Sequence, residues 1–463
     1  MNVPFNPIVA TDSYKVSHHK QYPANTEAIY SFLESRGGQW EETVFFGLQY
    51  YLMQYLEGPV VTRENIEDAA DDFELHFGTP DLYNRTGWER ILNVHGGRLP
   101  VKICAVPEGT VVPTHNVLMT IENTDPQLPW VSNYLETLLS MVWYPSTVAT
   151  QSREMKKVLG RYLTETGGID GIDFKLHDFG FRGSTSVESA GIGGLAHLTS
   201  FKGTDTMQAL VCARKYYDER MAGYSIPAAE HSTITSWGRK NEAQAFGNML
   251  EQFPTGLVAV VSDSYDIFAA CRELWGEQLR EKVLARDGVL VVRPDSGYPP
   301  EIVVKVLDTL GEKFGFSVNV QGYKVLNPKV RVIQGDGIDY EMLSLILEAI
   351  KQAGWSAENV AYGSGGGLLQ KLNRDTQKFA IKNCAVRHGG VWQDVMKDPV
   401  TDPGKRSKAG RLALVKADGT YRTIRENEAS RLGLANELLP VFQNGEILAK
   451  YNLTEVRQRI AAA

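Results

Sequence analysis

The chain has 463 residues, of which 43% are hydrophobic and 22% are charged, a composition typical of a globular protein long enough for two or three domains. Its net charge of -7 and its pI of about 5.8 argue against broad binding to nucleic acids or anionic membranes. No basic leader with an apolar run opens the sequence, and no apolar run is long enough to span a bilayer, so we expect a cytoplasmic protein.

The first 150 residues contain one strongly helical segment, 62–77, followed by a region of short strands. Residues 99–123 alternate in runs broken by proline, glycine and asparagine, which is typical of an antiparallel meander. The tail has the same character, with Asp418 and Gly419 at a predicted hairpin turn. We therefore predict a smaller, mainly antiparallel β domain formed by residues 34–134 and 389–463.

From about residue 170 onward, a short β-branched run ending in Asp, Gly or Ser is repeatedly followed by an amphipathic helix. These strand and helix pairs occupy residues 174–198, 257–284, 288–314, 329–354 and 358–375. Polar residues follow nearly every strand, which favours a (β/α) barrel-like domain over an open parallel sheet. We assign this α/β domain to residues 1–33 and 135–388.

The four cysteines are far apart and form neither a CxxC pair nor a metal-site spacing with histidine. They are Cys104, Cys212, Cys271 and Cys384. This pattern predicts reduced thiols.

Residues suited to binding a phosphorylated ligand stand at the predicted strand ends, where a barrel would gather them at one rim. They are His177, Asp178, Phe179, Arg182, Asp205, Glu230, His231, Asp263, Arg293, Asp295, Gly335, Asp336 and the glycines at 365–367. Each one alone has an ordinary structural explanation, such as a helix cap or a tight turn. Six successive strand ends with such residues are better explained by a binding site.

The chemistry of this set matches a phosphorylated substrate. The sequence GSGGG at 363–367 can present backbone N–H groups to an anion, and arginines, including Arg374, can bind phosphate oxygens. Carboxylates such as Asp263 and Asp295 can hold Mg²⁺ together with substrate phosphates. No G-x-S-x-G elbow, no GxxxxGK[ST] loop and no complete dinucleotide-binding fingerprint is present.

Motifs along the chain make it similar to the nicotinamide phosphoribosyltransferase group of the nicotinate/nicotinamide phosphoribosyltransferase family. They are ATDSYKVSHHKQYP, ETVFFGLQYYL, HDFGFRG, FKGTDT, PAAEHSTI, VSDSYDI, RPDSG, VIQGDG, GSGGGLLQKLNRD and KDPVTDPGKRSKAGRL. Any one of them is weak, but their order and spacing from about residue 8 to about residue 450 are specific.

This resemblance implies a type II phosphoribosyltransferase fold and a homodimer whose active sites are shared across the interface. It implies transfer of a phosphoribosyl group from 5-phosphoribosyl-1-pyrophosphate to nicotinamide, with Mg²⁺ and with ATP as a coupled co-substrate. It also implies that ATP phosphorylates His231, with Glu230 holding the other imidazole nitrogen. No protein nucleophile is needed for the transfer itself, because the pyridine nitrogen is already unprotonated.

The resemblance also implies roles for the residues that bind substrate. Phe179 and, from the partner subunit, Tyr14 would stack on the pyridine ring. Asp205 would accept a hydrogen bond from the carboxamide and would repel the carboxylate of nicotinate. The other implied contacts are Arg293 to the carboxamide, Asp295 and Gly335 to ribose, Asp12 near Tyr14, and Arg182, Gly365, Gly366, Arg374, Lys382, Lys397 and Lys405 to phosphate. Asp336 is a further candidate for substrate binding, and its carboxylate is also of the kind that can hold Mg²⁺.

Two alternatives remain open from the sequence. An enzyme of the same architecture can act on nicotinate or quinolinate, although Asp205 argues against both acids. A non-catalytic binding or signalling protein can use the same scaffold, although the complete set of polar residues argues for catalysis.

Overall fold

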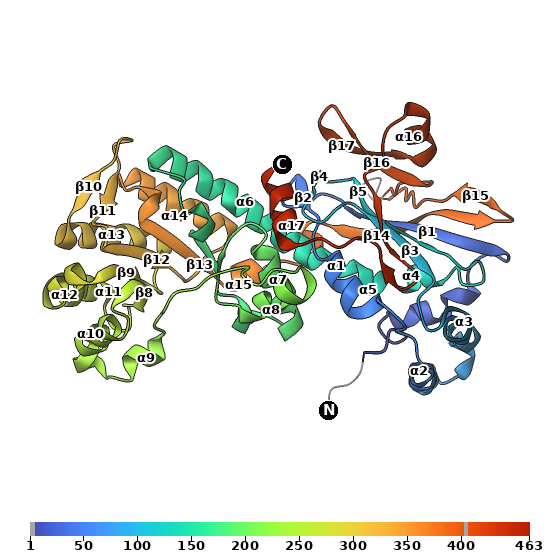
Figure 1. The fold of residues 1–463 in the computed structure, drawn as a ribbon, viewed down its shortest axis with the longest axis horizontal. Helices are drawn as coiled ribbons and strands as arrows, with labels where there is room; N and C mark the ends of the chain where they lie inside the picture. The colour runs from blue at the N-terminus through green and yellow to red at the C-terminus, as the bar shows by residue number, and fades with distance from the viewer. Residues whose placement is uncertain (1–4, 402–405) are drawn as a thin grey trace. The chain divides into compact units, whose positions relative to one another are not determined.

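A computed structural model describes residues 5–401 and 406–463, which form two compact units. The first unit, called here the barrel unit, consists of residues 148–214 and 219–372 and contains a parallel sheet (Figure 1). The second, the antiparallel unit, consists of the described residues up to 147 together with 215–218 and 373–463. The predicted α/β fold with a separate antiparallel domain is confirmed.

Six strands in the described part of the barrel unit form one parallel sheet in the order β7-β6-β13-β12-β9-β8. These strands are β6 (Leu176–Asp178), β7 (Gly203–Thr204), β8 (Thr255–Val261), β9 (Asp287–Arg293), β12 (Val330–Gln334) and β13 (Val360–Ser364). Because all of them are parallel, their carboxyl ends lie along the same rim of the sheet.

An irregular segment, 224–229, bonds to both edge strands of this sheet. Tyr224 exchanges main-chain hydrogen bonds with the β7 side, where its carbonyl accepts from Thr204 at 3.0 Å. On the β8 side, the Ala229 N–H donates to the Ala259 carbonyl, and the Ala259 N–H donates to the Pro227 carbonyl, both at 2.9 Å. The segment therefore closes the curved sheet into a barrel-like ring.

Amphipathic helices cover the sheet (Figure 1). In α13 (Pro299–Phe314), Val303, Val306, Leu307 and Leu310 are all fully buried, which is the i, i+3, i+4, i+7 stripe expected for a helix packed on a sheet. The other helices of this unit are α6 (Trp143–Thr166), α7 (Val187–His197), α8 (Met207–Tyr216), α9 (His231–Thr235), α10 (Glu242–Gln252), α11 (Ile267–Ala269), α12 (Arg280–Ala285), α14 (Tyr340–Gln352) and α15 (Gly366–Leu369).

Two predicted helices of the barrel unit differ in detail. The helix expected over 265–284 is α11 and α12 joined by a π-helical stretch, Ala270–Gln278. The helix expected after residue 367 ends already at Leu369 in α15, because the Lys371 N–H bonds back to the Gly366 carbonyl and closes the turn. A small hairpin, β10 (Phe316–Val318) with β11 (Lys324–Leu326), completes the unit.

The main sheet of the antiparallel unit has the order β15-β14-β1-β5-β3-β18-β19. Its strands are β1 (Thr26–Ser35), β3 (Val101–Ala105), β5 (Val117–Asn123), β14 (Phe379–His388), β15 (Val391–Asp394), β18 (Leu439–Gln443) and β19 (Glu446–Ile447), and the separate pairs are β2 (Glu42–Val44) with β4 (Val111–Pro113) and β16 (Leu412–Ala417) with β17 (Thr420–Arg425). The β16–β17 hairpin turns at Asp418 and Gly419, as predicted.

The helices of the antiparallel unit are α1 (Leu48–Tyr51), α2 (Arg63–Phe77), α3 (Arg85–His95), α4 (Val131–Tyr134), α5 (Glu136–Ser140), α16 (Glu426–Leu432) and α17 (Leu453–Ala461). The predicted helix at 62–77 is α2, and Thr62 caps its first turn by accepting from the Asn65 N–H.

The compact units divide the chain differently from the predicted domain boundaries. Most of β1 and all of β14 lie in residues that we assigned to the barrel, yet the two strands pair with each other in the antiparallel sheet. The β1 strand is buried on both faces and bonded along both edges, to β14 and to β5. A strand of this kind has the same continuous apolar pattern as a barrel strand, so the pattern alone does not distinguish the two.

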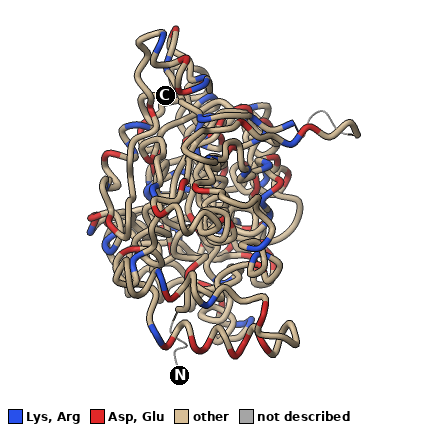
Figure 2. The backbone as a smooth tube through the Cα atoms, turned by 90° about the vertical axis from the view of Figure 1, so that its right-hand side faces the viewer, with Lys and Arg blue, Asp and Glu red and all other residues tan. Residues whose placement is uncertain are grey.

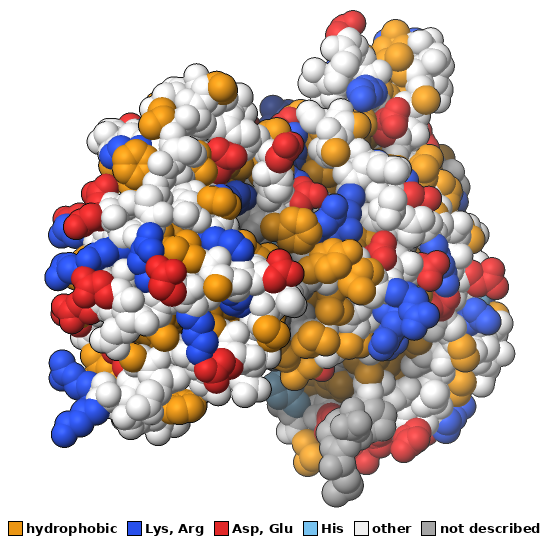
Figure 3. Space-filling view, turned by 60° about the vertical axis from the view of Figure 1, so that its left-hand side comes forward, with side chains coloured by type: hydrophobic (Ala, Val, Ile, Leu, Met, Phe, Trp, Pro, Cys, Tyr) orange, Lys and Arg blue, Asp and Glu red, His pale blue; other side chains and the backbone are white. Residues whose placement is uncertain are grey.

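The distribution of charged residues and the state of the cysteines agree with what the composition predicts. Basic and acidic residues are spread along the whole chain (Figure 2), and both signs are mixed on the face drawn in Figure 3. None of the four cysteines, all of which lie in the described part of the chain, forms a disulfide bond. Among the described residues, no helix combines the length and the apolar character that crossing a bilayer requires.

Candidate active site

A cavity of about 790 Å³ lies at the carboxyl ends of the parallel strands. It is lined by the residues that follow β6, β7, β9, β12 and β13, together with 228–230 of the closing segment. The sequence-predicted residues that line it are Phe179, Arg182, Asp205, Glu230, Arg293, Asp295, Gly335, Asp336, Gly365 and Gly366. The expectation that separate strand ends meet around one pocket is therefore confirmed for these residues.

Phe179 forms an aromatic wall of this cavity. Its N–H donates to the Ser364 carbonyl at 2.9 Å, and its ring packs directly over Gly363, where an added Cβ would come within 1.9 Å of a ring carbon. On its other side the ring contacts a small apolar cluster that includes Val291 and Ile333. Glycine at position 363 is thus what lets the ring lie against the sheet.

Asp205 presents a carboxylate to the same cavity from the loop after β7. One of its oxygens accepts a hydrogen bond from the hydroxyl of Ser225, in the closing segment. Among the described residues, no ion pair includes Asp205, so its charge is not neutralised by a lysine or arginine. A carboxylate in this state is a good acceptor for N–H donors and disfavours anions.

His231 lies at the start of α9, next to Glu230, the N-cap residue of that helix. Its Nε2 is 3.0 Å from Oδ1 of Asp263, and its Nδ1 is 3.9 Å from Oδ2 of Asp295. The Glu230 carboxylate instead accepts a hydrogen bond from Ser232. The prediction that Glu230 holds the second imidazole nitrogen is therefore wrong, and Asp263 makes this contact.

Asp263 also links His231 to the loop after β9. Its Oδ2 accepts from the Asp295 N–H at 3.1 Å, and Asp295 in turn bonds Nη2 of Arg293 at 3.0 Å. His231 and Asp263 do not line the cavity themselves, but this chain of contacts joins them to Asp295, which does. A histidine held through Nε2–H keeps its lone pair on Nδ1.

The glycine-rich loop after β13 forms another wall of the cavity. Gly367 approaches the Ile338 carbonyl so closely that an added Cβ would be 2.2 Å away. Gly365 precedes α15 with no side chain capping its first N–H groups. Exposed N–H groups at a helix start are suited to phosphate oxygens, as the sequence predicted.

The carboxylates that we expected to bind metal are not equally available. Both oxygens of Asp263 are engaged, by His231 on one side and by Asp295 and Ser296 on the other. Among the described residues, no group of three or more His, Cys, Asp or Glu side chains is arranged to hold a metal ion. Asp295 and Asp336 line the cavity, and carboxylates of this kind fit a cation that arrives with a diphosphate, although Oδ2 of Asp295 also accepts from Arg293.

Five predicted site residues belong to the antiparallel unit: Asp12, Tyr14, Arg374, Lys382 and Lys397. The predicted phosphate contact Lys405 lies outside the described residues.

The segment that carries Asp12 and Tyr14 is held in place by the buried ammonium group of Lys15. The Lys15 ammonium pairs with Glu136 at 2.8 Å and donates to the Asn133 carbonyl, while the adjacent Tyr14 side chain is exposed. Asp12 is held by the Thr137 hydroxyl at 2.7 Å. An exposed aromatic side chain on an anchored segment is available for a contact outside its own unit.

Sequence reasoning did not predict Ser225 as a partner of Asp205, or Asp263 as the partner of His231. The residues of the first pair are 20 positions apart in the chain, and those of the second pair are 32 positions apart. Only the closed ring of strands brings them together. The signal available in the sequence was weak in each case, since serine and aspartate at strand ends most often cap helices.

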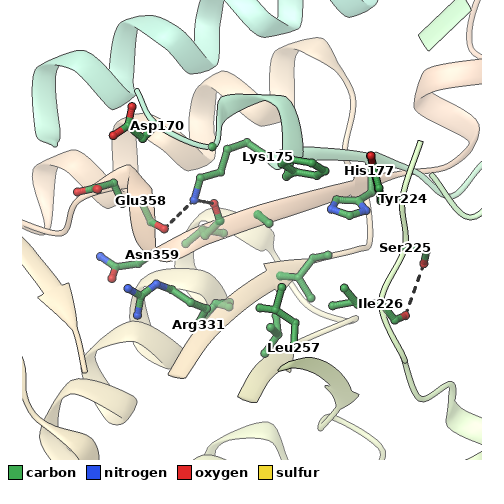
Figure 4. A pocket seen from close by; sticks show the side chains of 17 residues that line it. Asp170, Lys175, His177, Tyr224, Ser225, Ile226, Leu257, Arg331, Glu358 and Asn359 are labelled. Atoms are coloured by element: carbon green, nitrogen blue, oxygen red, sulfur yellow. Dashed lines mark hydrogen bonds between the residues drawn. The ribbon is translucent and has the colours of Figure 1, made fainter. Parts of the chain in front are cut away.

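A second cavity, of about 450 Å³, lies toward the amino ends of the same strands (Figure 4). Its lining is mainly apolar and includes Ile226, Leu257 and Val291. Its two basic side chains bond to main-chain carbonyls: Lys175 Nζ donates to Glu358 at 2.7 Å, and Arg331 Nη1 donates to three carbonyl oxygens at 2.7–3.3 Å. The glycines at 365–367 line the first cavity and not this one, so the first cavity is the better candidate for binding a phosphorylated ligand.

Comparison with known proteins identifies the family of the chain. Residues 174–444 match the nicotinate phosphoribosyltransferase (NAPRTase) family, and residues 6–103 match the nicotinamide phosphoribosyltransferase N-terminal domain. A nicotinamide phosphoribosyltransferase of Xanthomonas campestris pv. campestris (strain 8004) is 53% identical, with 99% of this chain and 98% of that protein aligned. One of Acinetobacter baylyi is 33% identical, over 100% of this chain and 98% of its own.

Solved structures of low sequence identity share the fold. A nicotinate-nucleotide pyrophosphorylase from Pyrococcus furiosus has a TM-score of 0.62 at 17% identity, covering 100% of this chain and 97% of its own. Human nicotinic acid phosphoribosyltransferase has a TM-score of 0.57 at 18% identity, covering 98% and 93%. The strand order, the cavity at the strand ends and the family match point to one conclusion: the chain belongs to the nicotinate phosphoribosyltransferase family of phosphoribosyl-transferring enzymes.

Proposed function

We propose that this enzyme transfers the phosphoribosyl group of 5-phosphoribosyl-1-pyrophosphate to nicotinamide, giving nicotinamide mononucleotide and pyrophosphate in NAD salvage. The observation that carries the choice of substrate is the carboxylate of Asp205, which lines the cavity together with the ring of Phe179. An aromatic wall and a hydrogen-bond acceptor are what a flat ring with a carboxamide requires.

The charge of Asp205 discriminates between the amide and the acid. The carboxamide NH₂ donates to a carboxylate, whereas nicotinate brings a second negative charge to the same place. Two like charges about 4 Å apart near a protein surface repel by about 4 kcal/mol. A penalty of this size is enough to reverse the preference between two substrates that are otherwise nearly identical in shape.

The transfer step breaks the bond between C1 of the ribose and the pyrophosphate oxygen and forms a bond between C1 and the pyridine nitrogen. The sugar becomes oxocarbenium-like and the leaving group becomes more anionic, so positive charge near the phosphates stabilises the transition state. Arg182 and the N–H groups around Gly365 and Gly366 line the cavity and are placed to do this. Arg293 is fixed by Asp295 and orients the carboxamide.

We expect Mg²⁺ to enter with the diphosphate of the donor, which it would neutralise as the leaving group departs. Asp295 and Asp336 line the cavity and would hold this ion, while Asp263 bonds to His231.

ATP coupling through a phosphohistidine is the role that we propose for His231. The side chain of His231 is 45% exposed, so it is accessible to a nucleotide, and the contact between Nε2 and Asp263 leaves Nδ1 as the nucleophilic nitrogen. The γ-phosphoryl group would pass from ATP to Nδ1, with ADP leaving, and the phosphohistidine would later be hydrolysed.

We also propose a cytoplasmic homodimer. The exposed ring of Tyr14 and the nearby Asp12 would complete the ring-binding site of a partner subunit, and Arg374, Lys382, Lys397 and Lys405 would supply further phosphate contacts. Burial lowers the pKa of Lys382, so its ammonium gains from a nearby anion.

Turnover of nicotinamide and nicotinate by the purified enzyme, with and without Asp205→Ser, tests the choice of substrate. We expect the wild type to prefer nicotinamide by at least about 100-fold in kcat/KM, which corresponds to about 2.7 kcal/mol. The variant removes both the acceptor and the repulsive charge, so we expect its preference to fall to within about tenfold.

The two alternatives give different outcomes. A wild type that prefers nicotinate is an acid-specific enzyme, and the assignment of Asp205 is then wrong. A protein that releases no pyrophosphate and takes no label on His231 from ATP labelled at its γ-phosphate is a binding protein on this scaffold.

A further inference from the structure

Asp178 is a buried acidic residue that none of the roles above uses. It is the last residue of β6 and is fully buried, and it does not line the cavity, although the next residue, Phe179, does. Within the described part of the chain, no ion pair includes it. A buried carboxylate without a cation is unfavourable for folding unless hydrogen bonds compensate, so its partners are informative.

One carboxylate oxygen of Asp178 holds the loop that carries the aromatic wall. Oδ1 accepts from the Gly180 N–H at 2.7 Å, just beyond Phe179. The Phe179 N–H itself donates to the Ser364 carbonyl at 2.9 Å. The backbone is thereby fixed on both sides of the ring, to β13 through Ser364 and to the end of β6 through the Asp178 side chain.

The rest of Asp178 holds the loop that carries the amide acceptor. Its main-chain carbonyl accepts from the Asp205 N–H at 2.9 Å, and its Oδ2 lies 3.4 Å from the hydroxyl of Thr204. The same hydroxyl accepts from the Thr206 N–H at 3.0 Å, which bends the chain around Asp205. Asp205 is therefore flanked by two residues whose positions depend on Asp178.

The space around this carboxyl group is closed. An added Cβ on Gly194 of α7 would lie 2.8 Å from Oδ2, and one on Gly180 would lie 3.1 Å from Oδ1. Glycine at these two positions therefore lets the backbone approach the carboxyl group closely on both oxygens.

We propose that Asp178 is a positioning residue that sets the distance between the Phe179 ring and the Asp205 carboxylate. This inference rests on the proposed function, because stacking on the ring and hydrogen bonding to the amide must both be satisfied by one rigid ligand. An error of about 1 Å in such a geometry costs about 100-fold in rate. The substrate class that needs this spacing is a planar nitrogen heterocycle with an exocyclic amide.

Steady-state kinetics of Asp178→Ala and Asp178→Asn, with nicotinamide and the phosphoribosyl donor varied separately, test this proposal. We expect Asp178→Ala to raise KM for nicotinamide at least about tenfold and KM for the donor less than about threefold. Asp178→Asn keeps an acceptor for Gly180, so we expect a smaller rise. The preference for amide over acid should fall together with the KM effect.

Thr166→Val is the matched control for simple destabilisation. Thr166 is also fully buried and also has two hydrogen bonds, to the Tyr162 carbonyl and from the Ala357 N–H, but it does not line the cavity. We expect this variant to have a lower melting temperature, while KM for nicotinamide and KM for the donor each change by no more than about twofold.

The proposal is overturned if Asp178→Ala only lowers the melting temperature and leaves both KM values unchanged, as expected for Thr166→Val. If Asp178→Ala does not fold, Thr204→Val removes the hydroxyl that contacts both Asp178 Oδ2 and the Thr206 N–H on the Asp205 side, and it must still raise KM for nicotinamide selectively. Failure of the proposed function is a separate result, since it shows as a wild-type enzyme that does not turn over nicotinamide.

Discussion

Two cavities of the barrel unit lie at opposite ends of the same strands, and they differ in the kind of residues that line them. The cavity at the carboxyl ends is lined by aspartates, arginines and glycine-rich loops, including Asp205, Arg293 and Gly365. The cavity at the amino ends is mainly apolar, and its cations, Lys175 and Arg331, bond to backbone carbonyls. The lining at the carboxyl ends is suited to a charged ligand. At the amino ends, the two cations instead donate hydrogen bonds to backbone carbonyls of the unit itself.

The difference follows from the direction of the strands. At the carboxyl ends, each strand is followed by the start of a helix, where unpaired N–H groups and a positive dipole end favour anions. At the amino ends, chain segments expose carbonyl groups, which attract lysine and arginine as hydrogen-bond donors. The strand β6 shows both effects, since Lys175 precedes it and Asp178 ends it.

Replacing one arginine in each cavity by alanine should give the largest difference in activity between two variants. In the first cavity, Arg293→Ala removes a guanidinium group that bonds Asp295. We expect kcat/KM for nicotinamide to fall about 1,000-fold, equivalent to about 4 kcal/mol, because Asp295 is then left without its cation. Steady-state kinetics of the purified variant check this value.

Arg331→Ala is the counterpart in the second cavity. Its Nη1 donates to three carbonyl oxygens, so we expect the free energy of unfolding to fall by about 1–3 kcal/mol while kcat/KM stays within about threefold. Equal losses of activity in the two variants would mean that the two cavities are not functionally distinct.

A pH series separates the buried groups at the two ends of β6. Burial raises the pKa of Asp178 from 3.8 to about 6, and the negative charge of Asp205 adds to this effect. The folded state thus favours the protonated form, and the resulting stability is fully present below pH 3.8 and is lost as the pH rises through about 6. Asp178→Asn cannot titrate, so its free energy of unfolding relative to wild type should rise over this window, by up to about 3 kcal/mol.

Lys175→Met should show the opposite dependence. Burial lowers the pKa of Lys175 from 10.5 to about 8, so the neutral amine is favoured in the folded state. The stability from this shift is present above pH 10.5 and is lost as the pH falls through about 8, so the variant should gain relative to wild type as the pH falls. Urea unfolding of all three proteins measures both trends, and a difference that does not vary with pH contradicts the burial of the group concerned.

The sequence predicted the strands and helices of the barrel unit better than it predicted the contacts between side chains. The repeated strand and helix pattern predicts which residues follow each strand, and parallel strands place all of these at one rim. Phe179, Asp205, Arg293 and Asp336 line the cavity for this reason. The pattern fixes which loops meet, but it does not fix which side chains touch.

Glu230 and Asp263 show where the sequence was insufficient. Glu230 is next to His231 in the chain, but its extended N-cap conformation, with φ of -114° and ψ of 171°, sends the two side chains in different directions. Asp263 is 32 residues away and reaches His231 only because the closing segment bonds to β8. Such a contact depends on how the ring of strands closes, which local sequence does not encode.

The ring of Phe179 lies between the two cavities, and Gly363→Ala should displace it. The ring lines the first cavity and packs on Val291 and Ile333, which line the second, while an added Cβ at Gly363 would come 1.9 Å from a ring carbon. Because the ring must move, we expect KM for nicotinamide to rise about 10–30-fold, or about 1.4–2 kcal/mol, with kcat less affected. Gly247→Ala in α10 is the control, since its nearest neighbour would be 3.6 Å away and alanine favours helix. A lower melting temperature for Gly363→Ala with an unchanged KM would mean that the position of the ring does not limit nicotinamide binding.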